Sequence, residues 1–376
     1  MHGINAMIRE LEEIGANPKD SVIQTMKDTG KKAIGCFPIY SPEELVYAAG
    51  MLPVGMWGGQ TTGTLSDQYL QTFCCSIMKA NLEQGLLGTY DLLSGVIVTA
   101  YCDTLKCMIE NWKTAFPKMN VMPVVYPQNR KIDAGKEYLR DEFQRILGQL
   151  EEIAGEKVTA ENLENSIEIY DEYRATMQKF AEIVPQYPTL FSAKSRHLII
   201  KAAYFMDKKI YTEKVGKLIE EVKKLPEESS TLKRIIMTGL IAEPDGLLDI
   251  VSENQMFVVA DDLAHESRQF RTIAPKTGDA LNRMVERIAM QDGCAFLYDA
   301  GKTRGSHLLE LAEKYRADGI IVCQLKFCDP EEMDYPIIKK ELEAAGIPFL
   351  YLEIEQQMDS LEQLRTRIQS FGEMLS

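Results

Sequence analysis

Two stretches of the chain, GVIVTAYCD at residues 95–103 and GIIVCQLKFCD at residues 319–329, share one pattern. In each, a run of apolar and β-branched residues leads into a Cys–Asp pair, and a helical stretch and another apolar run follow. Continuous apolar runs of this kind are typical of strands in a parallel sheet that is covered on both faces. The cysteine and the next expected strand, residues 102 and 121 or 328 and 347, are 19 residues apart in both stretches. We therefore expect two related α/β units.

Similar apolar runs recur on either side of a helical middle segment. Within that segment, residues 163–183 carry apolar side chains at three- and four-residue steps, which predicts an amphipathic helix with a packing role. Amphipathic helices are also expected at the start of the chain and at residues 360–374. The expected strands are residues 31–40, 52–57, 95–101 and 121–127 before the helical segment, and 234–241, 256–262, 294–299, 319–327 and 347–355 after it.

This order of elements predicts an α/β fold with two Rossmann- or flavodoxin-like parallel-sheet domains joined by a helical segment. The 376 residues are too many for one ordinary hydrophobic core and suit two or three domains. The expected boundaries are an N-terminal α/β domain over residues 1–131, a helical domain over 132–231 and a C-terminal α/β domain over 232–376.

The composition argues against several classes of protein. The net charge of −14 gives a surface that repels nucleic acid, and no basic stripe offsets it. The sequence has no apolar run of about 18 residues that would span a membrane, and its start lacks the features of a secretory signal. We therefore expect a cytoplasmic protein. In that compartment the eight cysteines are expected to be thiols or metal ligands rather than disulfides.

Three cysteines stand where a metal site would form. Cys102 and Cys328 each follow an expected strand and precede a helix, and Cys75 opens another helical stretch. Ligands of open α/β sheets collect beyond the carboxyl ends of the strands, and the positive end of a helix favours the thiolate that binds metal. An iron–sulfur cluster or zinc is the expected occupant. The alternative is that each cysteine is a small buried hydrophobe.

The other five cysteines are expected to have different roles. Cys107 follows Cys102 by five residues in the same helical stretch and is either a spare ligand or a packing residue. Cys74 adjoins Cys75, so at most one of these two is expected to bind metal. Three others lie in or at the start of expected strands and are interpreted as core residues: Cys36, Cys294 and Cys323.

Eight segments in this order resemble one family of enzymes. They are GCFPIYSPEELVYAAGMLPVGMWGG (35–59), FCCSIMKA (73–80), VTAYCDTLKC (98–107), VVYPQNRK (124–131), VVADDLAHESRQFR (258–271), QLKFCDPEEMDYP (324–336), IEQQ (354–357) and RTRIQSFGEML (365–375). Together they resemble the β subunit, the smaller D-component, of 2-hydroxyacyl-CoA dehydratases. That family acts on 2-hydroxyglutaryl-CoA, 2-hydroxyisocaproyl-CoA and similar thioesters, and is related to benzoyl-CoA reductase. The resemblance covers nearly the whole chain.

The resemblance implies a cofactor and a reaction. The cluster cysteines of the family fall on Cys75, Cys102 and Cys328, which implies a [4Fe-4S] cluster between the two α/β domains with a fourth ligand other than cysteine. The implied enzyme is an oxygen-sensitive hydro-lyase of anaerobic amino-acid fermentation. It converts an (R)-2-hydroxyacyl-CoA into an (E)-2-enoyl-CoA through a ketyl radical, and the β-subunit cluster relays or stores the electron. Flavin (FMN) stays open as a second cofactor of the complex, because some relatives carry it.

The implied partners are an α subunit, which holds most of the acyl-CoA site, and a transient ATP-dependent iron–sulfur activator protein. No catalytic residue is assigned in this chain. Two alternatives keep the cluster: a subunit of a related acyl-CoA or benzoyl-CoA reductase, and a homodimeric cluster protein. A third alternative is a non-catalytic scaffold, metal-free or zinc-bound, that positions a partner. The partner chain and the metal content distinguish these alternatives.

Three other features have simpler interpretations. GKTRGS at residues 301–306 lacks the first glycine of an ATP-binding loop, because Phe296 stands there, so ATP binding is not expected. The acidic and basic side chains of residues 261–271 are expected to form a structural ion-pair network, with His265 a surface or hydrogen-bonded histidine. Glu43 and Glu44 are placed in the first turn of a helix, where carboxylates are stabilising, and only the resemblance puts them near the cluster.

Overall fold

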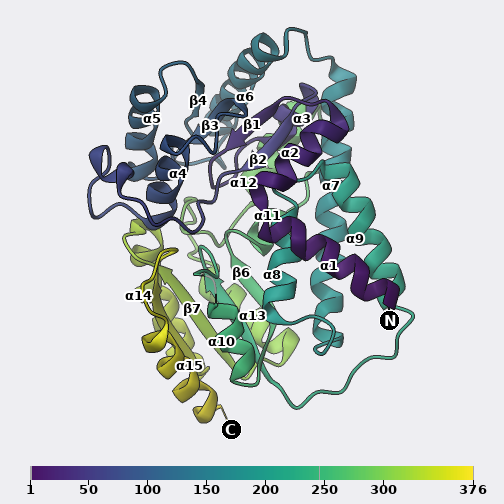
Figure 1. Ribbon diagram of the computed structural model, residues 1–376, viewed down its shortest axis with the longest axis vertical. Helices are drawn as coiled ribbons and strands as arrows, with labels where there is room; N and C mark the ends of the chain where they lie inside the picture. The colour runs from purple at the N-terminus through teal and green to yellow at the C-terminus, as the bar shows by residue number, and fades with distance from the viewer. Residues whose placement is uncertain (1, 245, 376) are drawn as a thin grey trace.

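The computed structural model describes residues 2–244 and 246–375 and contains two parallel four-stranded sheets (Figure 1). The strand order is β2-β1-β3-β4 in the first sheet and β6-β5-β7-β8 in the second. Both are the flavodoxin-like order, so the α/β expectation is confirmed and the matching orders support two related halves. The strands are β1 Ala33–Cys36, β2 Leu52–Gly55, β3 Leu93–Thr99, β4 Asn120–Val124, β5 Lys233–Gly239, β6 Met256–Leu263, β7 Gly319–Leu325 and β8 Phe349–Ile354.

Helices cover the sheets and fill the segment between them. The helix α1 packs against α8 and α9, although they are far apart in the sequence (Figure 1). Within the described residues, no helix is both long and apolar enough to cross a membrane. The helices are α1 His2–Ala16, α2 Pro18–Thr29, α3 Glu43–Ala48, α4 Ser76–Leu86, α5 Asp103–Ala115, α6 Asp133–Ala154, α7 Ala160–Ile183, α8 Ala193–Ala202, α9 Lys208–Val222, α10 Leu247–Glu253, α11 Ser267–Phe270, α12 Ala280–Met290, α13 Arg304–Tyr315, α14 Asp329–Ala345 and α15 Glu362–Met374, with short 3₁₀ turns η1 Leu65–Gln68 and η2 Val184–Gln186.

Helix α7 confirms the expected amphipathic stripe. It begins after Thr159, whose hydroxyl accepts a hydrogen bond from the Asn162 N–H while the Asn162 side chain accepts one from the Thr159 N–H. This reciprocal capping satisfies two donors that a helix start leaves free. The apolar positions at three- and four-residue steps are all buried, as a packing role requires.

The strand expected at residues 294–299 is wrong, because that segment is a loop. The Asp299 carboxylate accepts hydrogen bonds from the backbone N–H groups of Gly293, Gly301 and Thr303. An aspartate side chain that binds nearby backbone donors offers the chain an alternative to a sheet ladder. The apolar residues of the run are therefore used in loop packing and not in a strand.

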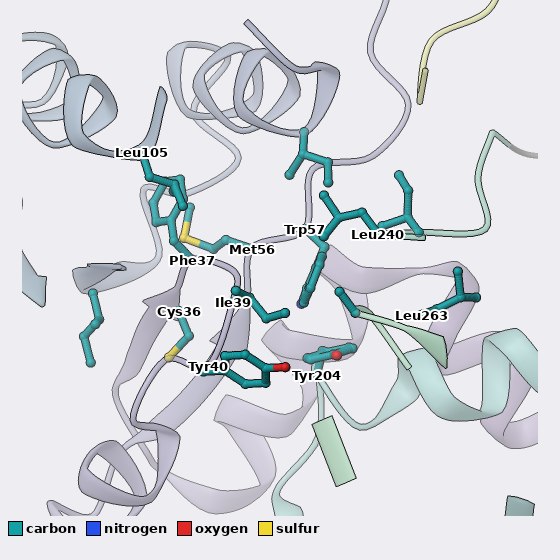
Figure 2. Close-up of a cluster of buried hydrophobic side chains, with 14 of the residues drawn as sticks. Cys36, Phe37, Ile39, Tyr40, Met56, Trp57, Leu105, Tyr204, Leu240 and Leu263 are labelled. Carbon is teal, nitrogen blue, oxygen red and sulfur yellow. The ribbon is translucent and has the colours of Figure 1, made fainter. Parts of the chain in front are cut away.

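The two halves share part of their hydrophobic core. Figure 2 shows Ile39 and Tyr40, from the loop after β1, together with Trp57, Leu240 and Leu263. All five side chains are buried in one cluster, and the last two belong to the second α/β half. Separating the halves would expose these side chains to water, at roughly 1.5–3 kcal/mol for each large apolar side chain. Their burial therefore fixes how the ends of the two sheets face each other.

Candidate functional site

Cys75, Cys102 and Cys328 line one pocket. Each is the residue immediately before a helix: Cys75 precedes α4, Cys102 precedes α5 and Cys328 precedes α14. Two of these helices belong to the first half of the chain and one to the second. The structure thus brings together all three cysteines that the sequence motifs selected.

The pocket lies at the carboxyl ends of the central strands of both sheets. In the order β2-β1-β3-β4, the chain leaves β1 and β3 in opposite directions, so a crevice opens between their carboxyl ends. The second sheet has the same arrangement at β5 and β7. Ile39 follows β1, Leu240 follows β5 and Phe327 follows β7, and all three line the cysteine pocket. One pocket therefore occupies the ligand-binding position of both sheets.

The pocket distinguishes the cysteines that stand close together in the sequence. Cys75 lines it, whereas the adjacent Cys74 does not. Cys107 is exposed on α5 and lies outside the pocket, so it is not placed as a spare ligand. The remaining cysteines are buried, as expected of core residues: Cys36, Cys294 and Cys323.

Burial dominates the protonation of the three thiols. It raises the pKa of Cys75 to about 12, and it also raises the pKa values of Cys102 and Cys328. Backbone N–H groups act in the opposite direction, as where the Leu105 N–H donates to Cys102 Sγ at 3.4 Å. The N–H groups at the helix starts thus favour the thiolates as expected, but desolvation outweighs them in the metal-free chain.

The start of α14, which carries Cys328, is held by a buried ion-pair network. Glu331 accepts from Arg268 Nη1 at 2.9 Å and lies 2.8 Å from Arg304 Nη1. Both arginines also contact Asp262, whose side chain is fully buried, at 2.9 Å, and Arg271 contacts it at 2.7 Å. This confirms the structural role expected for the charged segment at residues 261–271. Three guanidinium groups and the carboxylates of β6 and α14 thereby fix the helix relative to the second sheet.

The start of α4, which carries Cys75, is held from the other half of the chain by Gln356. The Gln356 N–H donates to Ser76 Oγ at 3.0 Å, and its side-chain amide donates to the Trp57 carbonyl at 2.8 Å and to Glu243 Oε2 at 2.7 Å. A Cβ atom on Gly58, where φ is +77°, would lie 2.2 Å from Gln356 Oε1. Glycine at position 58 therefore leaves room for this amide. The motif IEQQ contains Gln356, but its role required the fold.

Glu43 and Glu44 do not line the cysteine pocket. They line a second pocket together with Arg174, Lys208 and Arg287. Burial opposes ionisation of Glu44, but the guanidinium groups of Arg287 and Arg174 outweigh it and lower the pKa of Glu44 to about 2. The two carboxylates are at the start of α3, as expected, and serve this charged pocket.

The interpretation of His265 as a surface or hydrogen-bonded histidine is wrong. Its side chain is buried, and neither ring nitrogen has a hydrogen-bond partner among residues 2–244 and 246–375. His197 and Glu243 lie beside it, and the sequence pattern singled out neither of them. Neither His197 nor Glu243 stands near another metal-ligating residue in a recognised sequence motif, so these three residues come together only in the folded chain.

The amino-acid sequence matches the family model described as "2-hydroxyglutaryl-CoA dehydratase, D-component" over residues 38–375. It is 46% identical to the (R)-phenyllactyl-CoA dehydratase beta subunit of Clostridium sporogenes, over 100% of both chains. It is 42% identical to the lactoyl-CoA dehydratase subunit beta of Anaerotignum propionicum, again over 100% of both chains. The (R)-2-hydroxyglutaryl-CoA dehydratase subunit beta of Acidaminococcus fermentans is 38% identical over 99% of this chain and 100% of its own length.

Proposed function

The chain belongs to the 2-hydroxyglutaryl-CoA dehydratase D-component family, and from this membership we propose that it is the β subunit of a 2-hydroxyacyl-CoA dehydratase. Relatives that match it from end to end are named as β subunits of enzymes for three different 2-hydroxyacyl-CoA thioesters. The enzyme is a hydro-lyase, and an α subunit completes it.

One observation supports a cluster in this subunit: three cysteine thiols from three helix starts meet in a single pocket. Three sulfur donors in mainly apolar surroundings fit an iron–sulfur cluster with one position left for a different ligand. We assign the cluster to Cys75, Cys102 and Cys328. The common structural zinc sets of four cysteines and histidines are not complete here, because the pocket lining contains no histidine and no fourth cysteine among the described residues and its other donor side chains include Asp329.

The bound cluster would supply one-electron chemistry, as a relay or store for the electron that the reaction borrows. In the proposed reaction, one electron enters the thioester carbonyl of an (R)-2-hydroxyacyl-CoA to form a ketyl radical, and the 2-hydroxyl group leaves. A proton is then lost from C3, and the electron is recovered as the (E)-2-enoyl-CoA forms. The first electron would come from an ATP-dependent activator protein.

The residues of this chain hold the thiols and limit solvent around them. The side chains of Ile39, Leu240 and Phe296 form part of the apolar lining. An apolar shell controls water access to a metal site and tunes its potential. Glu331 and Gln356 act at a distance by fixing the starts of α14 and α4.

The test is the metal content of the protein purified without oxygen, together with any chain that co-purifies. We expect about four irons and four acid-labile sulfides for the cysteine pocket. The variant Cys328→Ser loses this iron, whereas the matched control Cys107→Ser, outside the pocket, retains it. Full iron content and full dehydratase activity in Cys328→Ser, or sulfur-ligated zinc in place of iron, would contradict the proposal.

A further inference from the structure

A second group of metal-ligating side chains lies apart from the cysteines. His197 on α8, Glu243 in the loop after β5 and His265 just after β6 each offer one ligand atom, and these atoms all lie within 4.8 Å of one another. All three side chains are buried. None of them lines the cysteine pocket.

His265 is the residue that requires a partner. Its side chain is 1% exposed, and among the described residues neither Nδ1 nor Nε2 has a hydrogen-bond partner. The ring is fixed in place, stacked on Tyr204 with centroids 5.0 Å apart and packed against Trp57 at 4.7 Å. A buried imidazole without hydrogen-bond partners costs stability, and its ring nitrogens are available to bind a metal.

His197 has the hydrogen-bonding arrangement of a metal ligand. Its Nδ1 lies 2.8 Å from Glu266 Oε1, which leaves Nε2 facing Glu243 Oε1 at 3.9 Å. Histidines that bind metal almost always donate their other ring N–H to a carboxylate or carbonyl, which fixes the ring and its tautomer. Glu266 provides that carboxylate and is itself held by Arg196.

We propose that His197, Glu243 and His265 form a binding site for a divalent transition-metal ion, with zinc as the best fit. Two imidazoles and one carboxylate are a common three-ligand set for zinc. Zinc–nitrogen and zinc–oxygen bonds of about 2.0–2.2 Å place tetrahedral ligands roughly 3.3 Å apart. The ligand atoms would therefore move together by about an ångström. A small pocket beside Leu198 and Leu248 reaches His197 and Glu243 and gives the ion an approach.

Positive charge already occupies this position in the metal-free chain. Lys201 Nζ lies 2.5 Å from Glu243 Oε1. Metal binding at Glu243 would displace this ammonium group.

The proposed ion would also stabilise the region of the cysteine pocket. Glu243 Oε2 accepts from the Gln356 side chain at 2.7 Å, and the Gln356 N–H donates to Ser76 Oγ at 3.0 Å. Ser76 follows Cys75 directly at the start of α4. A metal that fixes Glu243 would thus hold this chain of contacts, as a structural ion separate from the cluster.

The test measures zinc, iron and sulfide in the anaerobically purified complex after dialysis against a chelator and readdition of Zn²⁺ alone. We expect about one zinc per chain, with X-ray absorption showing nitrogen and oxygen ligands near 2.0–2.1 Å and no sulfur near 2.3 Å. The variant His265→Asn binds Zn²⁺ more than about tenfold more weakly. The matched control His307→Asn, from a half-buried histidine on α13, binds Zn²⁺ as the unaltered chain does.

Two further measurements distinguish zinc binding at this site from metal binding in the cysteine pocket and from a loss of folding in the variant. In Cys328→Ser, iron and sulfide fall while zinc stays at about one per chain. If His265→Asn does not fold, the unaltered chain decides: a rise in its melting temperature with added Zn²⁺, and nitrogen and oxygen ligation, support the site. Failure to bind Zn²⁺ at micromolar concentrations, or sulfur ligation of the bound zinc, overturns the proposal whether or not the iron cluster is present.

Discussion

The substitution Gly239→Ala is expected to be among the most damaging single-methyl changes in the chain. Gly239 ends β5, just before Leu240 enters the cysteine pocket. Its φ is +135°, a backbone conformation that residues other than glycine rarely adopt. An added Cβ would also lie 2.1 Å from the carbonyl oxygen of Cys323 in the neighbouring strand β7. The new methyl group would clash with backbone atoms of β7, which cannot move aside as a flexible side chain could.

The expected cost follows from these two effects. A residue with a Cβ in such a backbone conformation costs about 1–3 kcal/mol. Forcing a methyl group into closely packed surroundings costs about 1–3 kcal/mol more. The sum, roughly 2–6 kcal/mol, is a large part of the 5–15 kcal/mol that typically separates folded and unfolded states. Because β5 and β7 both end at the pocket, iron content should fall along with stability.

The assay is urea unfolding of Gly239→Ala followed by circular dichroism, with iron content measured on the same preparation. Gly148→Ala is the matched control, since Gly148 lies inside α6 and its added Cβ would meet nothing within 4 Å. Alanine favours a helix over glycine, so the control should gain up to about 1 kcal/mol. If Gly239→Ala lowers the free energy of unfolding by less than about 0.5 kcal/mol, the close approach of β5 and β7 is refuted.

Three further predictions concern buried charges. Glu44 has a pKa of about 2 in the folded chain against its ordinary 4.5, so its contribution to folding stability is fully present above pH 4.5 and is lost as the pH falls to 2. In urea unfolding, Glu44→Gln should therefore cost roughly 3 kcal/mol more at pH 6 than at pH 2. Asp262→Asn should lower the free energy of unfolding by about 3 kcal/mol, because it removes a buried carboxylate charge that three guanidinium groups share. The exposed control Asp141→Asn on α6 should change it by at most about 0.5 kcal/mol, and equal effects would argue against the network. Lys201→Met should strengthen Zn²⁺ binding by about tenfold or more, because the lysine ammonium group no longer competes with the metal for Glu243. Calorimetric titration measures this affinity, and an unchanged affinity would contradict the competition.

The central strands β3 and β7 were predictable from the sequence because they are buried on both faces. Such strands consist of continuous apolar, β-branched residues, as in residues 95–99 and 319–323. The same rule failed at residues 294–299, where Cys294 and Leu297 are buried but the Asp299 carboxylate binds the backbone N–H groups of the loop. Burial and strand formation are separate properties, and an apolar run reports only the first.

The cysteine positions were predictable because each stands at a local junction between a strand or loop and a helix. The residues that hold those junctions were not, because their partners are distant in the chain. Gln356 and Ser76 are 280 residues apart, and Arg268 reaches Glu331 across 63 residues. The group of His197, Glu243 and His265 has the same origin. No local spacing marks contacts that arise only when one half of the chain packs on the other.

The shared pocket has a consequence for how the protein is made. A ribosome releases Cys75 and Cys102 well before Cys328, which stands 226 residues after Cys102 at the start of α14. A nascent chain therefore carries an incomplete set of thiols until Cys328 has been made and the second sheet has docked on the first. The proposed cluster would have all three of its ligands only when both halves of the chain are present and packed together. A polypeptide truncated before Cys328 would lack the third ligand.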